Sequence, residues 1–447
     1  MPPAGHLHVG SSSWPLSAGS WQRVTVSEDL PQDLRTVWHQ SVTLHNLQPG
    51  RRRRIDLLLQ QDQGEEPAAS GYVSTIPEAL PRIPDQPYVV LLGSCFAWYQ
   101  DQAGLVGLNV KNLPDPYKPD LKILCGDQVY LDNPAIEAPV RTCASLATRL
   151  FQKYAETWFQ GDQRCGFGTF LSDSCTYFMA DDHEFWNNHP NWSPLLTLKK
   201  WPLPFINQWN DQTWIRYGED LYAAFQSSGK GRPQQFSLGS IDFFLLDTRF
   251  SRQKGSANFT DTQQLTQVTG WLAQLNQNPA VLVIGAPVCT APAGRLASWL
   301  ADRSLANYKQ YELLSDAILS CRRSLLVLTG DIHFNRIASA APQRAFFELA
   351  VSPLALVDEK VGGKFEKAPE KFPLQGTRAS LKIETKVLAD RYGKAWDGWP
   401  DHFATLSFTE TDQAVHIEVV VWRIGKTSPH HPVQSAVDSI ELPRRLA

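Results

Sequence analysis

Short runs of apolar residues recur through the middle of the chain, and longer stretches with helical periodicity separate them. The apolar runs lie at residues 88–92, 122–125, 175–179, 241–246, 280–284 and 324–328. Runs of this length without alternation are typical of strands that are buried on both faces of a sheet. Residues 140–159, 266–275 and 308–321 are predicted to be helices. Strands and helices that alternate in this way predict a layered α/β domain.

Alternating apolar and polar residues mark both ends of the chain. Residues 24–26, 41–44 and 55–59 alternate as strands do, and the turn residues Gln48-Pro49-Gly50 precede the third of these runs. The order resembles the E–F corner of a fibronectin-III-like sandwich. We therefore expect a small all-β sandwich domain with a linker over residues 1–85, the polar, proline-rich residues from Gln60 onward being the linker, and a second domain over residues 86–447. Near the end of the chain, residues 404–408 and 415–422 predict a hairpin.

Composition and charge narrow the class of protein. Of 447 residues, 43% are hydrophobic and 19% are charged, as in folded globular proteins. The net charge of −3 excludes a protein that binds nucleic acid through overall positive charge. No apolar run reaches the roughly 18 residues of a membrane span. The seven cysteines are odd in number and the N-terminus has no secretory pattern, so reduced thiols and a cytoplasmic location are expected.

Polar side chains follow five of the predicted buried strands. In open α/β sheets, ligands bind beyond the carboxyl ends of strands. Carboxylates gathered there repel one another and lose hydration, unless bound cations neutralise them. Oxygen ligands from Asp and Asn suit Ca²⁺, Mg²⁺ or Mn²⁺, whereas a thiolate or phenolate favours a transition metal. The motifs are Gly93-Ser94-Cys95, Gly126-Asp127, Asp181-Asp182-His183-Glu184, Asp247-Thr248-Arg249 and Gly330-Asp331-Ile332-His333.

Together these motifs resemble those of the PhoD-like (alkaline phosphatase D) branch of the calcineurin-like metallophosphoesterases, over roughly residues 88–340. The resemblance implies a four-layer core of two mixed sheets flanked by helices, which holds a cluster of two or more metal ions. It implies that Asp127 bridges two ions and that Cys95 and Tyr130 are thiolate and phenolate ligands of Fe³⁺. The remaining ligands that it implies are Asp101, Asp182, Asn187, Asp331 and His333.

The activity implied by this resemblance is hydrolysis of phosphomonoesters or phosphodiesters by a metal-bound hydroxide, with Ca²⁺ or Mn²⁺ beside Fe³⁺. His183 is expected to protonate the leaving oxygen, and Arg249 to hold a phosphate oxygen. Each role has a structural alternative. Cys95 and Tyr130 are then packed interior side chains, Arg249 pairs with an acid, and His183 orients another group.

A scaffold protein with an inactive phosphatase fold is the competing hypothesis from another class. Activity on p-nitrophenyl phosphate and its bis-ester, with and without added metal, separates the two. A serine hydrolase and a P-loop nucleotidase are set aside, because the sequence contains neither a Gly-x-Ser-x-Gly elbow nor a Walker-type loop.

Overall fold

The computed structural model describes most of the chain: residues 2–24, 28–34, 37–84, 86–101, 104–134, 137–159, 166–200, 207–227, 229–274, 278–294, 303–341, 344–355, 367–374, 380–388, 401–425 and 431–444.

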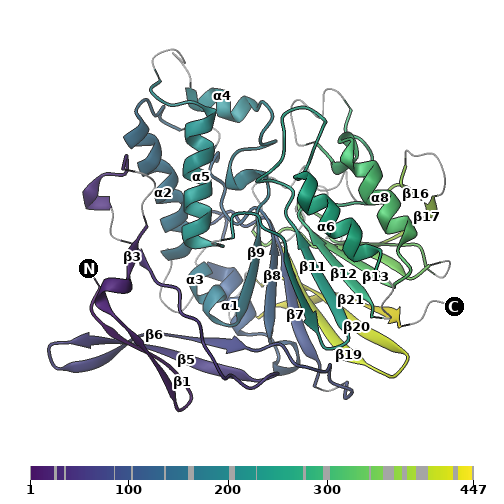
Figure 1. The fold of residues 1–447 in the computed structure, drawn as a ribbon, viewed down its shortest axis with the longest axis horizontal. Coiled ribbons are helices and arrows are strands. Elements are labelled where there is room, and N and C mark those ends of the chain that lie inside the picture. The colour runs from purple at the N-terminus through teal and green to yellow at the C-terminus, as the bar shows by residue number, and fades with distance from the viewer. Residues whose placement is uncertain are drawn as a thin grey trace.

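Two mixed sheets form the centre of the molecule (Figure 1). The six-stranded sheet has the order β21 (Val433–Pro443), β20 (Ala414–Arg423), β19 (His402–Glu410), β7 (Tyr88–Gly93), β8 (Leu121–Cys125) and β9 (Cys175–Met179). The seven-stranded sheet has the order β10 (Gln234–Leu238), β11 (Ile241–Leu246), β12 (Ala280–Ile284), β13 (Leu325–Thr329), β15 (Phe346–Ala350), β14 (Arg336–Ser339) and β18 (Glu384–Val387).

The strands that lead to the predicted polar motifs run parallel to one another. In the six-stranded sheet β7, β8 and β9 are parallel neighbours. In the seven-stranded sheet β11, β12, β13 and β15 are parallel neighbours. Because parallel strands end on the same side, each sheet presents its polar motifs along one edge.

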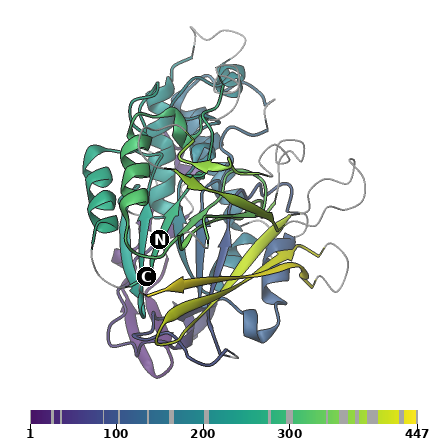
Figure 2. The same ribbon diagram turned by 90° about the vertical axis from the view of Figure 1, so that its right-hand side faces the viewer.

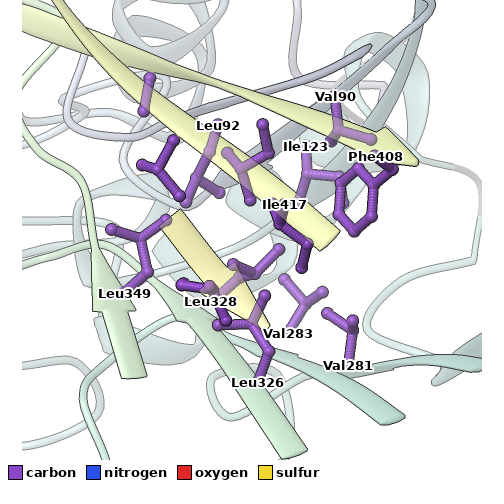
Figure 3. Packing of buried hydrophobic residues seen from close by; sticks show 14 of the residues in the cluster. Val90, Leu92, Ile123, Val281, Val283, Leu326, Leu328, Leu349, Phe408 and Ile417 are labelled. Atoms are coloured by element: carbon purple, nitrogen blue, oxygen red, sulfur yellow. The ribbon is translucent and has the colours of Figure 1, made fainter. Parts of the chain in front are cut away.

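One apolar cluster joins the facing sides of the two sheets (Figure 3). Val90 and Ile123 come from the six-stranded sheet, Val281 and Leu326 come from the seven-stranded sheet, and all four are fully buried. Removing apolar surface from water contributes about 25 cal/mol per Å², so this interface is a main source of stability. This packing also fixes the edge of the six-stranded sheet that carries polar motifs relative to that of the seven-stranded sheet.

Helices cover the outer sides of both sheets. Helices α6 (Thr262–Leu272) and α8 (Gln310–Ser320) share an apolar cluster with β11, β12 and β13. On the six-stranded sheet, α1 (Leu105–Lys111) and α3 (Phe167–Ser172) pack in another cluster. Figure 1 shows α2 (Cys143–Phe159), α4 (Pro194–Lys200) and α5 (Asp211–Phe225) together on one side of the molecule, and α6 and α8 on the other. This covering explains why the central strands are apolar on both faces.

The remaining elements are short or lie at the side of the molecule: α2 (Cys143–Phe159), α4 (Pro194–Lys200), α5 (Asp211–Phe225), the strand pairs β3 (Gln22–Arg23) with β4 (Trp38–His39) and β16 (Lys371–Phe372) with β17 (Leu381–Lys382), and the 3₁₀ turns Ala18–Ser20, Gln32–Leu34, Asp115–Tyr117, Asp182–Glu184 and Leu305–Asn307.

The N-terminal residues form a four-stranded antiparallel sheet. Its order is β2 (Ser12–Leu16), β1 (Gly5–Val9), β5 (Arg52–Gln61) and β6 (Gly64–Ser74). Figure 2 shows this sheet in purple at the foot of the molecule. Nη2 of Arg52 in β5 lies 2.8 Å from Oδ1 of Asp173, just before β9, so an ion pair joins this sheet to the central body.

The six buried strands, the hairpin β19–β20 and the three helices are confirmed, with shifts of a few residues at their ends. Two N-terminal predictions are wrong. Residues 41–44 form no strand, and residues 64–74 form β6 instead of a linker. The described N-terminal residues form one sheet and the strand pair β3–β4, while residues 25 and 26 lie outside the described ranges. A fibronectin-III-like sandwich and a domain boundary at residue 85 stay predictions.

In the described part of the chain, no helix has both the length and the apolar character that crossing a bilayer requires. The six cysteines that the structure describes all carry free thiols, as predicted, and Cys165 lies outside the described residues.

Candidate metal centre

The edges of the two sheets meet at the turns after β7, β8, β9 and β13. Gly126 follows β8 with φ of +95°, and a Cβ atom there would lie 2.4 Å from Cβ of Asp181. Gly330 follows β13, and a Cβ atom there would lie 2.3 Å from Oγ of Ser94. Only glycine permits such close approach. The two glycines therefore bring the aspartates that follow them to a shared edge.

Ligand-type atoms of five side chains meet at this edge in two overlapping groups, in each of which the atoms lie within 4.8 Å of one another. One group contains Asp127, Asp182 and His183, and the other contains Asp127, Asp181, Asp182 and Asp331. Asp127 and Asp182 belong to both groups. Two cations about 3.5–4 Å apart need a shared ligand, and the geometry offers two such carboxylates.

Uncommon backbone conformations concentrate at the same place. Among the described non-glycine residues, seven have positive φ. Four of the seven are residues predicted to bind metal: Cys95 (+58°), Asp127 (+59°), Asp331 (+68°) and His333 (+50°). Left-handed backbone is disfavoured for residues with a side chain, and it clusters at functional sites. The chain therefore holds these residues in place at some expense to local stability.

Burial and mutual repulsion dominate the electrostatics of the acidic groups. Burial raises the pKa of Asp127 well above its usual range; His183 opposes this rise, and Asp182 and Asp181 add to it. Arg249, which has no exposed surface, donates from Nε to Oδ1 of Asp181, and its Nη2 lies 3.9 Å from Oδ1 of Asp182. Among the described residues, the guanidinium of Arg249 and the imidazole of His183 bring positive charge to these four carboxylates, and bound cations would add more.

Cys95 and Tyr130 flank Asp127. Sγ of Cys95 lies 3.6 Å from Oδ2 of Asp127, and the ring of Tyr130 lies 4.2 Å from the ring of His183, between centroids. The Tyr130 hydroxyl is buried and has no hydrogen-bond partner among the described residues. Burial raises the pKa of both groups, and Asp127 raises each further. A buried phenol without a partner beside clustered carboxylates fits a ligand of a transition-metal ion.

Asp132 fixes the ring of His183. Its Oδ1 lies 2.7 Å from Nδ1 of His183, and its Oδ2 accepts the backbone N–H of Asn187 at 2.7 Å. Burial lowers the pKa of His183, but the carboxylates of Asp132, Asp182 and Asp127 outweigh burial and hold the pKa well above its ordinary value. Asn187 thus joins the site through its backbone, and a role for its side chain as a ligand stays a prediction.

Glu184 ties the two acidic turns together, a role that was not predicted. Its Oε2 accepts the backbone N–H groups of Asp127 at 3.0 Å and Asp181 at 2.8 Å, and its Oε1 accepts that of Gln128 at 2.7 Å. Nε2 of Gln226, the residue that follows α5, donates to the same carboxylate at 3.2 Å. Burial raises the pKa of Glu184 to about 7. Its place in the Asp-Asp-His-Glu motif was the one signal available in the sequence.

Besides Cys95, Tyr130 and Asn187, three further predicted site residues are in neither acidic group. Asp101 caps α1, because its Oδ1 accepts the backbone N–H of Val106 at 2.9 Å, and it lines a small cavity of about 20 Å³ with Leu354. Burial raises the pKa of Asp101 to about 7. Arg249 contacts carboxylates, as expected if its role is to pair with an acid. His333 is partly buried in the turn after β13. A phosphate contact by Arg249 and metal ligation by Asp101 or His333 stay predictions.

No protein-family model and no curated protein matches this sequence. A solved structure titled "Structure of PhoD" matches 100% of this chain and 84% of its own length, with a TM-score of 0.64 and 14% identity. A structure of GAP50, the anchor in the inner membrane complex of Plasmodium, matches 78% of this chain and 90% of its own length, with a TM-score of 0.35 and 9% identity. The first of these likenesses shows that this chain has the mixed α/β fold of PhoD.

Proposed function

We propose that this protein is a metal-dependent phosphoric ester hydrolase that acts on phosphomonoesters, phosphodiesters or both. The observation that carries the proposal is the convergence of Asp127, Asp182 and Asp331 from the ends of three strands in two sheets. The fold shared with PhoD supports it, because the sequence motifs resemble those of the PhoD-like phosphatases. On this proposal, the central body is the four-layer metallophosphatase core.

Bound cations would supply an activated water and would neutralise charge on the phosphoryl oxygens. Asp127 and Asp182 are the residues that both ions would share, and Asp331 would complete one ion's ligands. Cys95 and Tyr130 lie beside Asp127, where they would hold the more polarising ion, Fe³⁺. Ca²⁺ or Mn²⁺ would suit the oxygen ligands of the other group.

The chain's own residues position these ligands and handle the leaving group. Glu184 holds the turns that carry Asp127 and Asp181, and Arg249 balances the charge of Asp181. Because Asp132 engages Nδ1 of His183, Nε2 is the nitrogen left to give a proton to the departing oxygen. Proton transfer by a positioned imidazole is a general way to stabilise a leaving alkoxide.

Hydrolysis of p-nitrophenyl phosphate and bis(p-nitrophenyl) phosphate by the full-length protein tests this function. Activity should fall on chelation and return when Ca²⁺, Mn²⁺ or Fe³⁺ is added back. Asp127→Asn should lower kcat by more than about 100-fold and reduce the bound metal measured by elemental analysis. Asp412→Asn, at a side chain that is 83% exposed, serves as the matched control. Hydrolysis of neither ester by a protein that binds no metal would instead favour the scaffold hypothesis.

A further inference from the structure

A second set of metal-type side chains lies on the N-terminal sheet. His6 and His8 of β1 and Glu65 of β6 offer ligand atoms that all lie within 4.8 Å of one another. We propose that these three residues form a separate site for a divalent transition-metal ion of the Zn²⁺ class. The inference does not depend on the proposed hydrolase activity, because no residue of the acidic groups takes part in it.

The alternation of β1 places the two imidazoles together. Side chains two positions apart in a strand lie on the same face, so His6 and His8 share one face while Leu7 and Val9 point to the other. Leu7 pairs with Leu57 and Val9 with Ile55 of the neighbouring strand β5. The apolar pairs thus fix which face of the sheet carries the histidines.

The third ligand comes from beyond the neighbouring strand. In the sheet order β2-β1-β5-β6, β5 lies between β1 and β6. Strands are spaced about 4.8 Å apart, so a contact across β5 requires two long side chains. Glu65 pairs with Gln60 of β5, and the N–H of Gln60 donates to the carbonyl of Ala4 at 2.8 Å, beside β1. This register brings Glu65 Oε1 into hydrogen bonding with Nδ1 of His6.

Gly5 holds β1 tightly against β5. A Cβ atom at this position would lie 2.1 Å from the carbonyl oxygen of Leu58, so the approach requires glycine. Leu58 is the residue that pairs with His6. The ligand-bearing strand is thereby fixed at the point where His6 reaches over β5 toward Glu65.

The three ligands match the chemistry of a zinc-class ion. Imidazole nitrogen and carboxylate oxygen bind Zn²⁺ at about 2.0–2.2 Å, and a water can complete a tetrahedral set. The ion would replace the proton between His6 and Glu65, and a small rotation of His8 would complete the site. The side chains of His6 and Glu65 are 42% and 30% exposed, so such adjustments are open to them. Hard ions such as Ca²⁺ prefer oxygen ligands, so this site differs in selectivity from the acidic groups.

An ion held in this way would join β1 to β6, two strands that are not adjacent in the sheet. A ligand that binds only the folded chain raises the free energy of unfolding. Once the ligand concentration exceeds the dissociation constant, this gain grows with the logarithm of that concentration. Zn²⁺ should therefore raise the thermal midpoint of the wild-type protein through a contribution that depends on His6, His8 and Glu65.

Isothermal titration of the metal-loaded full-length protein with ZnCl₂ tests the site. We expect the wild type to bind one more Zn²⁺ per chain than His8→Ala, and Glu65→Gln to weaken that binding at least tenfold. His416→Ala is the matched control, because Nδ1 of His416 lies 3.7 Å from Oε2 of Glu441 in an exposed cross-strand pair. The control should keep the wild-type stoichiometry.

Thermal melts and hydrolysis assays of the same variants provide the second readout. The Zn²⁺-dependent rise in the thermal midpoint should be smaller in His8→Ala and Glu65→Gln than in the wild type and His416→Ala, while the hydrolytic rate stays the same in all four proteins. Equal Zn²⁺ stoichiometry and equal thermal shifts in the wild type and both site variants would overturn the proposal, whatever the hydrolase assay shows.

Discussion

The carboxylate of Asp132 and the imidazole of His183 form a buried pair in which Oδ1 lies 2.7 Å from Nδ1. Asp132 comes from the turn after β8, and His183 from the turn after β9. The backbone N–H of His183 also donates to Oδ1 of Asp127 at 3.1 Å. The ring that would protonate the leaving group is therefore fixed relative to Asp127, one of the two carboxylates in both acidic groups. Asp132 is thus a positioning residue.

Replacing Asp132 by Asn keeps the shape of the side chain but removes the charge that orients His183. We expect kcat to fall about 10–100-fold, the usual effect of losing a group that orients a catalytic residue. The loss should be greater for phenyl phosphate than for p-nitrophenyl phosphate, because the more basic phenolate depends more on proton transfer. Steady-state kinetics on both esters measures this difference.

Asp115→Asn is the control for this comparison, since Asp115 is exposed in a 3₁₀ turn that precedes β8, whereas Asp132 follows it. If Asp132→Asn slowed both esters by the same factor, Asp132 would support the turn structurally without acting through His183.

The buried hydroxyl of Tyr130 leads to a spectroscopic prediction. A phenolate bound to Fe³⁺ absorbs visible light by charge transfer, so protein purified with iron should be coloured. Tyr130→Phe should lose the band, whereas Tyr99→Phe should keep it, since Tyr99 packs beside the small cluster that contains Tyr130 and is not a predicted ligand. A colourless protein that contains only Ca²⁺ or Mn²⁺ would remove Cys95 and Tyr130 from the ligand set and leave the hydrolase proposal standing.

The central strands and the meeting of the acidic residues could be predicted from sequence for one physical reason. Strands covered on both faces are apolar throughout. The sequence therefore shows β7, β8, β9 and β13 as continuous apolar runs, and the end of each run marks the end of a strand. The polar residues that follow them must then lie along sheet edges. That reasoning placed Asp127, Asp182 and Asp331 together, as the structure has them.

Residues that act through backbone contacts could not be found in this way. Glu184 accepts three backbone N–H groups, and Asp132 accepts one from Asn187, so the sequence does not show which backbone groups either carboxylate holds. The strand β6 was missed because Pro67 interrupts its pattern. Proline is tolerated there because β6 is an edge strand with a register shift beside Leu58, the partner of Pro67.

Gly126 should be sensitive to the smallest substitution. Gly126→Ala places a Cβ atom 2.4 Å from Cβ of Asp181 at a φ of +95°. We expect the free energy of unfolding to fall by more than about 2 kcal/mol, since the conformation alone costs about 1–2 kcal/mol. Metal content should fall with it, because the Asp127 and Asp181 turns must separate. Urea unfolding and elemental analysis measure the two effects.

Gly270→Ala is the matched control, because it also adds one methyl group to a glycine. Gly270 lies within α6, and a Cβ atom there would meet nothing within 4 Å. Alanine should stabilise this helix by about 0.5–1 kcal/mol. Unchanged stability and metal content in Gly126→Ala would show that the two turns do not need their close approach.

Lys122 in β8 gives the fold a pH dependence that is separate from the acidic groups. Its side chain is fully buried, and its Nζ donates to the carbonyl oxygen and to Oγ of Ser174, both at 2.7 Å. Burial lowers the pKa of Lys122 to about 7 from its usual 10.5. Below pH 7 the folded and unfolded chains both carry the proton. Between these two pKa values the unfolded chain binds more protons, so the stability due to this group rises with pH.

We therefore expect the wild type to gain stability relative to Lys122→Met as the pH is raised from 7 to 9, by on the order of 2 kcal/mol. Urea unfolding of both proteins at the two pH values measures the difference. Lys111→Met, at the exposed end of α1, controls for the loss of one positive charge. A difference between the wild type and Lys122→Met that stays constant with pH would mean that Lys122 keeps its proton when buried, held by the oxygens of Ser174.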